Sequence, residues 1–263
     1  MPRQTTHAVR AAVVMPKGGV GKTATDAALA WGLREHKKRT LVVDLDPQMA
    51  DLSLVLGIDK LRVGYTSREL MLHPEREFAP VKLDQYLDLV PADPDPVLTE
   101  MRLGKETMVS GPVKLRRALD KVEDRYDFIL CDCRPGGGAV MANTLVACGH
   151  IIAPVQLTRF AASCIVELST ILEEVFDGQS RPLIRYLPTF WTSDKESEEA
   201  LAFVEDKCRD TLYETRIPRA VAIARSMAEA TSLFDARFKD SKGPDAYRGF
   251  VQEFLARTEA IHV

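Results

Sequence analysis

A glycine-rich run directly follows an apolar stretch near the start of the chain. Residues Ala8 to Met15 form the apolar stretch, and KGGVGKT follows from Lys17 to Thr23. Three glycines within four positions let the backbone turn tightly and aim successive N–H groups inward. A helix that begins there adds the partial positive charge of its N-terminus. The segment therefore predicts a strand, a phosphate-binding loop and a helix, in that order.

Two lysines and a threonine distinguish this loop. The ordinary phosphate-loop pattern has a glycine five residues before Gly21, where this chain has Pro16, and the chain instead carries a second lysine, Lys17. Lys22 is placed to neutralise the outer phosphates of a nucleotide, and the Thr23 hydroxyl suits a magnesium ion that bridges two of them. Taken without further context, Lys17 reads as a flexible surface charge.

A second apolar run ends in two aspartates. Leu41 to Gln48 reads as a short buried strand whose polar end carries Asp44 and Asp46. The carboxyl ends of parallel strands form the ligand crevice of an open sheet, so both carboxylates are expected to face the phosphates. The residues leave open the alternative that both aspartates cap a following helix from Ala50 to Leu56.

A third apolar run, Tyr126 to Asp132, also ends in a carboxylate. P-loop enzymes hold magnesium or its coordinated water with an acidic residue at this place. Gly136 to Gly138 follow as a flexible turn suited to sensing a terminal phosphate. Arg134, which precedes that turn, is either a site residue or an ion-pair partner of a nearby acid.

With these motifs in this order, the chain resembles the ParA/Soj group of ATPases, whose deviant Walker A loop is also found in MinD and the nitrogenase iron protein. The matching segments are KGGVGKT, VVDLDPQ at Val42 to Gln48, YDFILCDCRPG at Tyr126 to Gly136, IIAPVQL at Ile151 to Leu157 and IPR at Ile217 to Arg219. The resemblance spans nearly the whole chain, from residue 8 to residue 258. It implies ATP and magnesium as ligands and slow, partner-stimulated hydrolysis of ATP as the reaction.

Alternation of strands and helices predicts an α/β fold with a doubly wound, mostly parallel sheet and helices on both faces, which is also the P-loop fold that the resemblance implies. Further strands are expected near Tyr86 to Val90, Ile151 to Val155 and Leu183 to Leu187. Apolar residues at helical spacing recur from Ala161 to Val175 and from Tyr247 to Leu255. Because no linker divides the 263 residues, we expect one domain over residues 1–263, with residues 1–7 as a flexible tail.

The resemblance also assigns roles to individual residues. The nucleotide-binding residues that it implies are Lys17, Gly18, Gly19, Val20, Gly21, Lys22, Thr23, Ala24 and Pro218. The magnesium residues are Thr23, Asp44 and Asp132. The catalytic residues are Lys17, Lys22 and Asp46. In this assignment Asp46 orients the attacking water, Lys17 reaches the partner's ATP across a sandwich dimer, and the segment around Pro218 closes over the base.

Four positions depart from the family pattern. Ala24 stands where a second threonine usually contacts the α-phosphate, and Ala28 stands in place of a common asparagine. Met49 replaces a frequent glycine, and Arg134 replaces the first of two prolines. These departures bear on switch geometry and hydrolysis rate more than on nucleotide binding.

Partition of DNA is the leading functional hypothesis. An ATP-bound homodimer is expected to bind DNA non-specifically and to be released when a ParB-like partner stimulates hydrolysis. The alternatives are a positioning ATPase for a non-DNA cargo, such as a carboxysome or chemoreceptor cluster, or a membrane-associated MinD-like regulator. An ATP-dependent ligase of the dethiobiotin synthetase type shares the fold, but Lys17 and the DPQ segment argue against it.

A net charge of -3 argues against DNA binding through bulk charge, so a local basic patch is required. Arg219 and Arg225, within a stretch that also contains Arg209 and Arg216, are the candidate DNA contacts. Some relatives have an arginine where this chain has Ala222, which weakens the assignment.

The remaining sequence features favour a cytoplasmic, nucleoid-associated protein without a membrane contact. No apolar stretch has the length of a membrane span, and the apolar face near the C-terminus is expected to dock on the core. The five cysteines read as reduced core residues. Cys131 and Cys133 are expected on opposite faces of their strand, which disfavours a shared metal.

Overall fold

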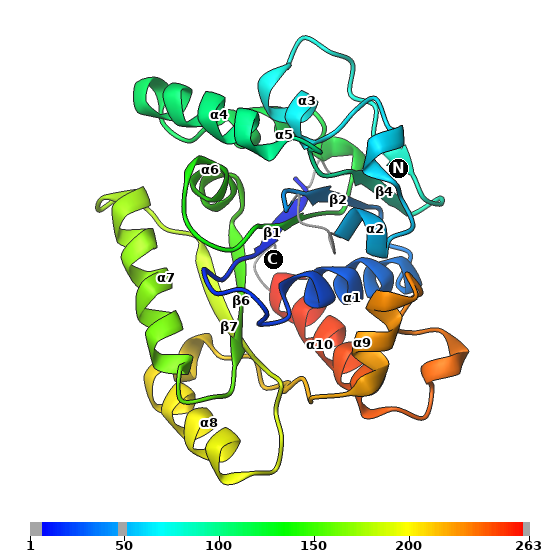
Figure 1. Cartoon of the computed structure of the whole chain (residues 1–263), viewed down its shortest axis with the longest axis vertical. Helices are drawn as coiled ribbons and strands as arrows, with labels where there is room; N and C mark the ends of the chain where they lie inside the picture. The colour runs from blue at the N-terminus through cyan, green and yellow to red at the C-terminus, as the bar shows by residue number, and fades with distance from the viewer. Residues whose placement is uncertain (1–6, 47–51, 260–263) are drawn as a thin grey trace.

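A seven-stranded sheet forms the centre of the computed structural model, which describes residues 7–46 and 52–259 (Figure 1). The strands are β1 (Val9–Val13), β2 (Thr40–Asp44), β3 (Val81–Lys82), β4 (Leu87–Val90), β5 (Phe128–Asp132), β6 (His150–Gln156) and β7 (Leu183–Thr189). Their spatial order is β3-β4-β2-β5-β1-β6-β7. Within the described residues all neighbouring strands pair in parallel except β3, which pairs antiparallel with β4 at the edge.

Helices connect and cover these strands. They are α1 (Lys22–Glu35), α2 (Leu52–Val55), α3 (Ser67–Leu72), α4 (Pro96–Ser110), α5 (Lys114–Leu119), α6 (Ala139–Ala147), α7 (Ala161–Phe176), α8 (Lys195–Cys208), α9 (Val221–Ala228) and α10 (Lys242–Glu259). Short 3-10 turns lie at Lys60–Arg62, Glu123–Arg125, Arg209–Thr211 and Ala236–Phe238. The predicted strands and both predicted helical stripes are confirmed, with shifts of a few residues at their ends.

Each face of the sheet has its own hydrophobic core. One core joins the sheet to α4, α5, α6 and α7 through residues such as Leu103 and Leu168, and the other joins it to α1 and α10 through Leu29 and Phe254. Figure 1 shows the two groups of helices on opposite sides of the strands. The prediction of a doubly wound sheet with helices on both faces is therefore confirmed.

The C-terminal helix packs into the protein along its apolar stripe. Tyr247, Phe250 and Phe254 of α10 are at most 1% exposed and lie in the core shared with α1. This confirms the predicted docking of the helix on the core. None of the helices in the described part of the chain combines the length and the apolar character needed to cross a bilayer.

The cysteine prediction needs one correction. All five cysteines are buried and unpaired, as expected for core residues. Cys131 and Cys133, however, lie in the same hydrophobic core together with Ile129. Side chains two positions apart point to the same face of an extended chain, so the expectation of opposite faces was wrong.

Helix α1 approaches α10 closely at Gly32. A Cβ atom added there meets Cγ2 of Val251 at 2.5 Å and Cβ of Val251 at 3.2 Å. Val251 is β-branched and is stiff in a helix, so its side chain cannot easily turn away. The absence of a side chain at Gly32 therefore sets the distance between the two helices.

We predict that Gly32→Ala lowers the free energy of unfolding by about 1–3 kcal/mol, because overpacking at this crossing outweighs the higher helix propensity of alanine. Gly104 of α4 provides the matched control, since an added Cβ there meets no atom within 4 Å. Gly104→Ala is expected to stabilise the chain by about 0.5–1 kcal/mol. Urea denaturation of both variants measures the difference. A Gly32→Ala protein as stable as the unmodified chain would contradict the packing argument.

Candidate functional site

The loop between β1 and α1 opens toward solvent at the carboxyl edge of the sheet. Gly19 and Gly21 adopt φ angles of 74° and 94°, which only glycine accepts without strain. Gly21 is the N-cap of α1, and no described side chain caps this helix. The Thr189 hydroxyl at the end of β7 donates to the Val20 carbonyl at 3.0 Å and so braces the loop. The predicted strand, loop and helix are confirmed, and the first N–H groups of α1 have no partner within the helix.

The two lysines of the loop have different surroundings. Lys22 is 6% exposed, and its Nζ donates to the Lys17 carbonyl at 3.1 Å. Burial lowers the pKa of Lys22, while the charges of Asp132 and Asp46 act in the opposite direction. Lys17 is half-buried, and its Nζ lies 5.1 Å from the centre of the Phe160 ring. A cation–π contact therefore holds Lys17 at the rim of the site.

Asp44 has partners of its own at the end of β2. Its Oδ1 accepts the backbone N–H of Asp46 at 3.0 Å, and its Oδ2 accepts the N–H and the hydroxyl of Ser53 at 2.7 and 2.6 Å. Ser53 lies in the first turn of α2, so the geometry gives Asp44 the capping role that the sequence left open. Its magnesium role stays a prediction. Asp46 is 7% exposed and lies close enough to Lys22 and Asp132 to affect the pKa of both.

Asp132 ends β5 directly beside Asp44 of β2 and is completely buried. Neither of its carboxylate oxygens has a hydrogen-bond partner among the described residues. The pKa of Asp132 is raised to about 7, chiefly by burial and also by the charge of Asp46, while the nearby Thr23, Asp26 and Lys22 act in the opposite direction. Thr23 and Asp26 both lie close enough to Asp132 to affect its pKa. A buried carboxylate with two unused oxygens beside a threonine hydroxyl fits a magnesium ion, which prefers oxygen ligands.

A second buried carboxylate without a hydrogen-bond partner among the described residues lies here, and the sequence reasoning missed it. Asp26 of α1 is 0% exposed, and both of its oxygens lack hydrogen-bond partners in the described structure. Burial, and then the charge of Asp132, raises the pKa of Asp26 well above its ordinary value. An aspartate inside the helix, immediately before the buried run Ala27 to Leu33, was the available signal.

The turn after β5 is tied to its neighbours. The N–H of Gly136 donates to the Pro16 carbonyl at 2.8 Å, which links this turn to the loop after β1. Glu100 of α4 accepts the N–H of Ala139 at the start of α6 and lies 3.9 Å from Nη1 of Arg134. Of the two roles predicted for Arg134, the structure shows the ion pair.

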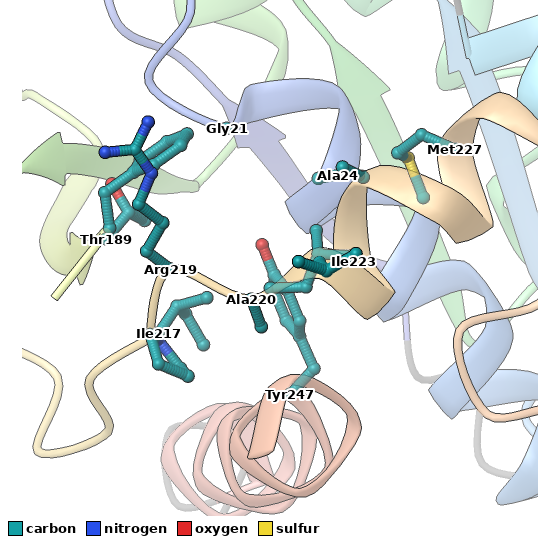
Figure 2. Close-up of a pocket in the computed structure, with 13 residues that line it drawn as sticks. Gly21, Ala24, Thr189, Ile217, Arg219, Ala220, Ile223, Met227 and Tyr247 are labelled. Carbon is teal, nitrogen blue, oxygen red and sulfur yellow. The ribbon is translucent and has the colours of Figure 1, made fainter. Parts of the chain in front are cut away.

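A cavity of about 420 Å³ lies beside the loop and the start of α1 (Figure 2). Gly21 and Ala24 line it from the loop side, and Pro218 also lines it, while the contact of Pro218 with a base stays a prediction. The sequence did not reveal Phe190 or Tyr247, which come from the end of β7 and from α10. Figure 2 shows the Tyr247 ring directed at the cavity, and its hydroxyl lies 3.2 Å from that of Thr25. The largely apolar lining suits a flat organic ring.

The candidate DNA contacts are not gathered into one unpaired basic patch. Arg219 is exposed and lines the cavity, so it lies at the mouth of the site. Arg225 pairs with Glu229 at 3.0 Å, and Arg216 pairs with Glu205 at 3.0 Å. DNA binding by Arg219 and Arg225 stays a prediction. Met49, the DPQ residues after Asp46 and the start of the helix expected at Ala50 lie outside the described residues.

Known proteins share this sequence and architecture. A family model described as an AAA domain matches residues 10–184. The sporulation initiation inhibitor protein Soj of Bacillus subtilis is 30% identical over 252 residues, which are 93% of this chain and 97% of that protein. The chromosome-partitioning ATPase Soj of Thermus thermophilus is 31% identical and covers 95% of this chain and 96% of its own length. The structure of cobyrinic acid a,c-diamide synthase from Mycobacterium smegmatis with bound ATP analog and magnesium is similar at a TM-score of 0.76 and 28% identity, covering 96% of each chain.

The raised pKa of Asp132 predicts a pH dependence of stability. The folded chain holds this proton up to about pH 7, whereas unfolded aspartate releases it near pH 4. Raising the pH across this window therefore lowers the free energy of unfolding, on the order of a few kcal/mol at most. When the pH rises from 5 to 8, the free energy of unfolding should fall less in Asp132→Asn than in the unmodified chain. Urea denaturation in EDTA measures this, and equal losses in both proteins would contradict the assignment.

Proposed function

Because the chain belongs to the Soj/ParA family of P-loop ATPases, we propose that it binds ATP with magnesium at the loop between β1 and α1 and hydrolyses it. The observation that carries the proposal is the unpartnered, buried carboxylate of Asp132 beside Lys22 and the uncapped N-terminus of α1. A magnesium–triphosphate supplies the charges that these three features lack.

The triphosphate lies along the loop in this proposal. The backbone N–H groups from Gly18 to Thr23 hold the phosphates, and Lys22 leaves the Lys17 carbonyl to neutralise the β- and γ-phosphates. Ala24 borders the α-phosphate without the usual hydroxyl. The adenine occupies the apolar cavity at Pro218 and Tyr247.

Thr23 and Asp132 hold the magnesium ion, and Asp44 supports the site while it anchors the start of α2. The ion neutralises charge that develops on the transferring phosphoryl group. Asp46, buried beside Asp132, orients the attacking water. The contact between Gly136 and the Pro16 carbonyl couples the turn after β5 to the same loop.

Lys17 links the nucleotide to a second copy of the chain. In the isolated chain its ammonium lies over the half-exposed ring of Phe160. This contact positions the charge at the rim, from which it reaches the ATP of a partner subunit in a sandwich dimer. A positive charge supplied in trans stabilises the transition state in other phosphoryl-transfer enzymes by about 10³ to 10⁵ in rate.

The biological output that we propose is DNA partition. The ATP-bound dimer binds DNA non-specifically through a surface that includes Arg219, and a ParB-like partner stimulates slow hydrolysis and release. Such a cycle places the protein on the nucleoid in the cytoplasm. A non-DNA cargo would use the same chemistry with a different adaptor, so DNA binding separates the two.

We predict that Lys22→Ala weakens ATP binding by roughly a hundredfold or more, because the outer phosphates lose their buried positive charge. Titration calorimetry with a non-hydrolysable ATP analogue and magnesium measures this. Lys195→Ala, on the exposed start of α8, is the control and should bind as the unmodified chain does. Unchanged affinity in Lys22→Ala would reject the phosphate site.

We predict that Lys17→Ala binds ATP but stays monomeric and loses ATP-dependent retention on DNA. Light scattering with and without ATP measures the pairing, and DNA binding at several salt concentrations measures the output, since electrostatic binding weakens as salt rises. An ATP-induced dimer of normal affinity in this variant would remove the contact in trans. Pairing without any DNA binding in the unmodified chain would favour the non-DNA cargo.

A further inference from the structure

Two unpartnered carboxylates lie together between α1 and the ends of the central strands. Asp26 and Asp132 are both 0% exposed, and none of their four oxygens accepts a hydrogen bond from a described residue. Asp26 and Asp132 are close enough for each to affect the pKa of the other, and Asp44 also acts on Asp26, so Asp26 lies near the carboxyl ends of β5 and β2. A buried polar atom without a partner is rare and calls for a ligand or another explanation.

The position of Asp26 on α1 places it on the phosphate side of the sheet edge. Asp26 follows Thr23 by three residues and Lys22 by four, so the three side chains share one face of the helix. Thr23 is the residue whose hydroxyl the proposed function assigns to magnesium. The carboxylate of Asp26 therefore lies next to Thr23 and Asp132, the two residues proposed to hold magnesium.

Among the described residues that act on one another at this place, the acidic side chains outnumber the basic ones. Lys22 lies close enough to Asp26 and Asp132 to interact with both carboxyl groups, and its Nζ donates a hydrogen bond to the Lys17 carbonyl. Once Lys22 pairs with a phosphate, its positive charge no longer compensates the two carboxyl groups. Two buried carboxyl groups then have no cation beside them, and ionising them there is costly unless a cation binds. A divalent cation supplies two positive charges and takes carboxylate oxygens as ligands.

We propose that Asp26 is a further residue of the magnesium site and that, with Asp132, it lets the chain hold a divalent cation of the Mg²⁺ or Mn²⁺ class before any nucleotide arrives. Magnesium is commonly held by one or two carboxylates, with water and phosphate completing its shell. No described group of three or more His, Cys, Asp or Glu side chains is arranged to hold a metal alone, so the Thr23 hydroxyl and water complete this site. The proposal rests on the proposed function only for the role of Thr23 and Asp132.

Binding of Mn²⁺ to the full chain without nucleotide tests this directly. Electron paramagnetic resonance measures free Mn²⁺ during titration, and we expect one saturable ion per chain at or below about 1 mM. Asp26→Asn should weaken this binding roughly tenfold or more, since one of two carboxylates is neutralised while the shape of the side chain is kept. Asp206→Asn, on the exposed face of α8, is the matched control and should leave the affinity unchanged.

The outcomes separate this site from the nucleotide site. Mn²⁺ binding by the unmodified chain that Asp26→Asn weakens supports the proposal even if ATP does not bind. Failure of the unmodified chain to bind Mn²⁺ overturns it, and this measurement needs no variant to fold. Equal Mn²⁺ affinity in Asp26→Asn and the unmodified chain also overturns it, and Asp26 then shares a proton with Asp132 as a purely structural pair.

Discussion

Charge buried at the carboxyl edge of the central strands is the constraint on which this structure depends. The parallel register places Asp44 opposite Asp132, and Asp132 opposite Val13, where the chain enters the glycine-rich loop. Asp44 is stabilised by Ser53, but Asp132 has no partner among the described residues. The folded chain thus holds a buried ionisable group whose charged form a bound cation would stabilise. This links the architecture of the sheet to the binding of a charged molecule.

The two hydrophobic cores stabilise the fold around these buried carboxyl groups. Helix α1 is buried along most of its length, and its contact with α10 at Gly32 fixes where its N-terminus lies. The opposite face is closed by α6, whose start is held by Glu100 near the turn after β5. Because the helices on both faces are packed against the sheet, the loop between β1 and α1 is held close to the carboxylates. A phosphate site built in this way is largely formed before its ligand arrives.

Much of the site was predictable because its information is local in sequence. An apolar run that ends in a polar motif predicts the loop and the strand before it. The same pattern predicts the strand that ends in Asp132. Asp44 was open between two roles, and its capping role became visible only from the position of Ser53 nine residues later. Phe190 and Tyr247 were missed because they join the cavity only through the fold. Cys131 and Cys133 were misjudged because the strand period was applied incorrectly, and Asp26 was overlooked because a polar residue in a buried helix has no motif of its own.

Calorimetric titration of a non-hydrolysable ATP analogue into the unmodified chain, with magnesium and then with EDTA, tests the central claim most directly. The buried carboxylate at the end of β5 predicts one nucleotide per chain with magnesium and much weaker binding without it. Absence of binding, or the same affinity in EDTA, would contradict the claim that a metal–triphosphate compensates the charge buried at this edge of the sheet.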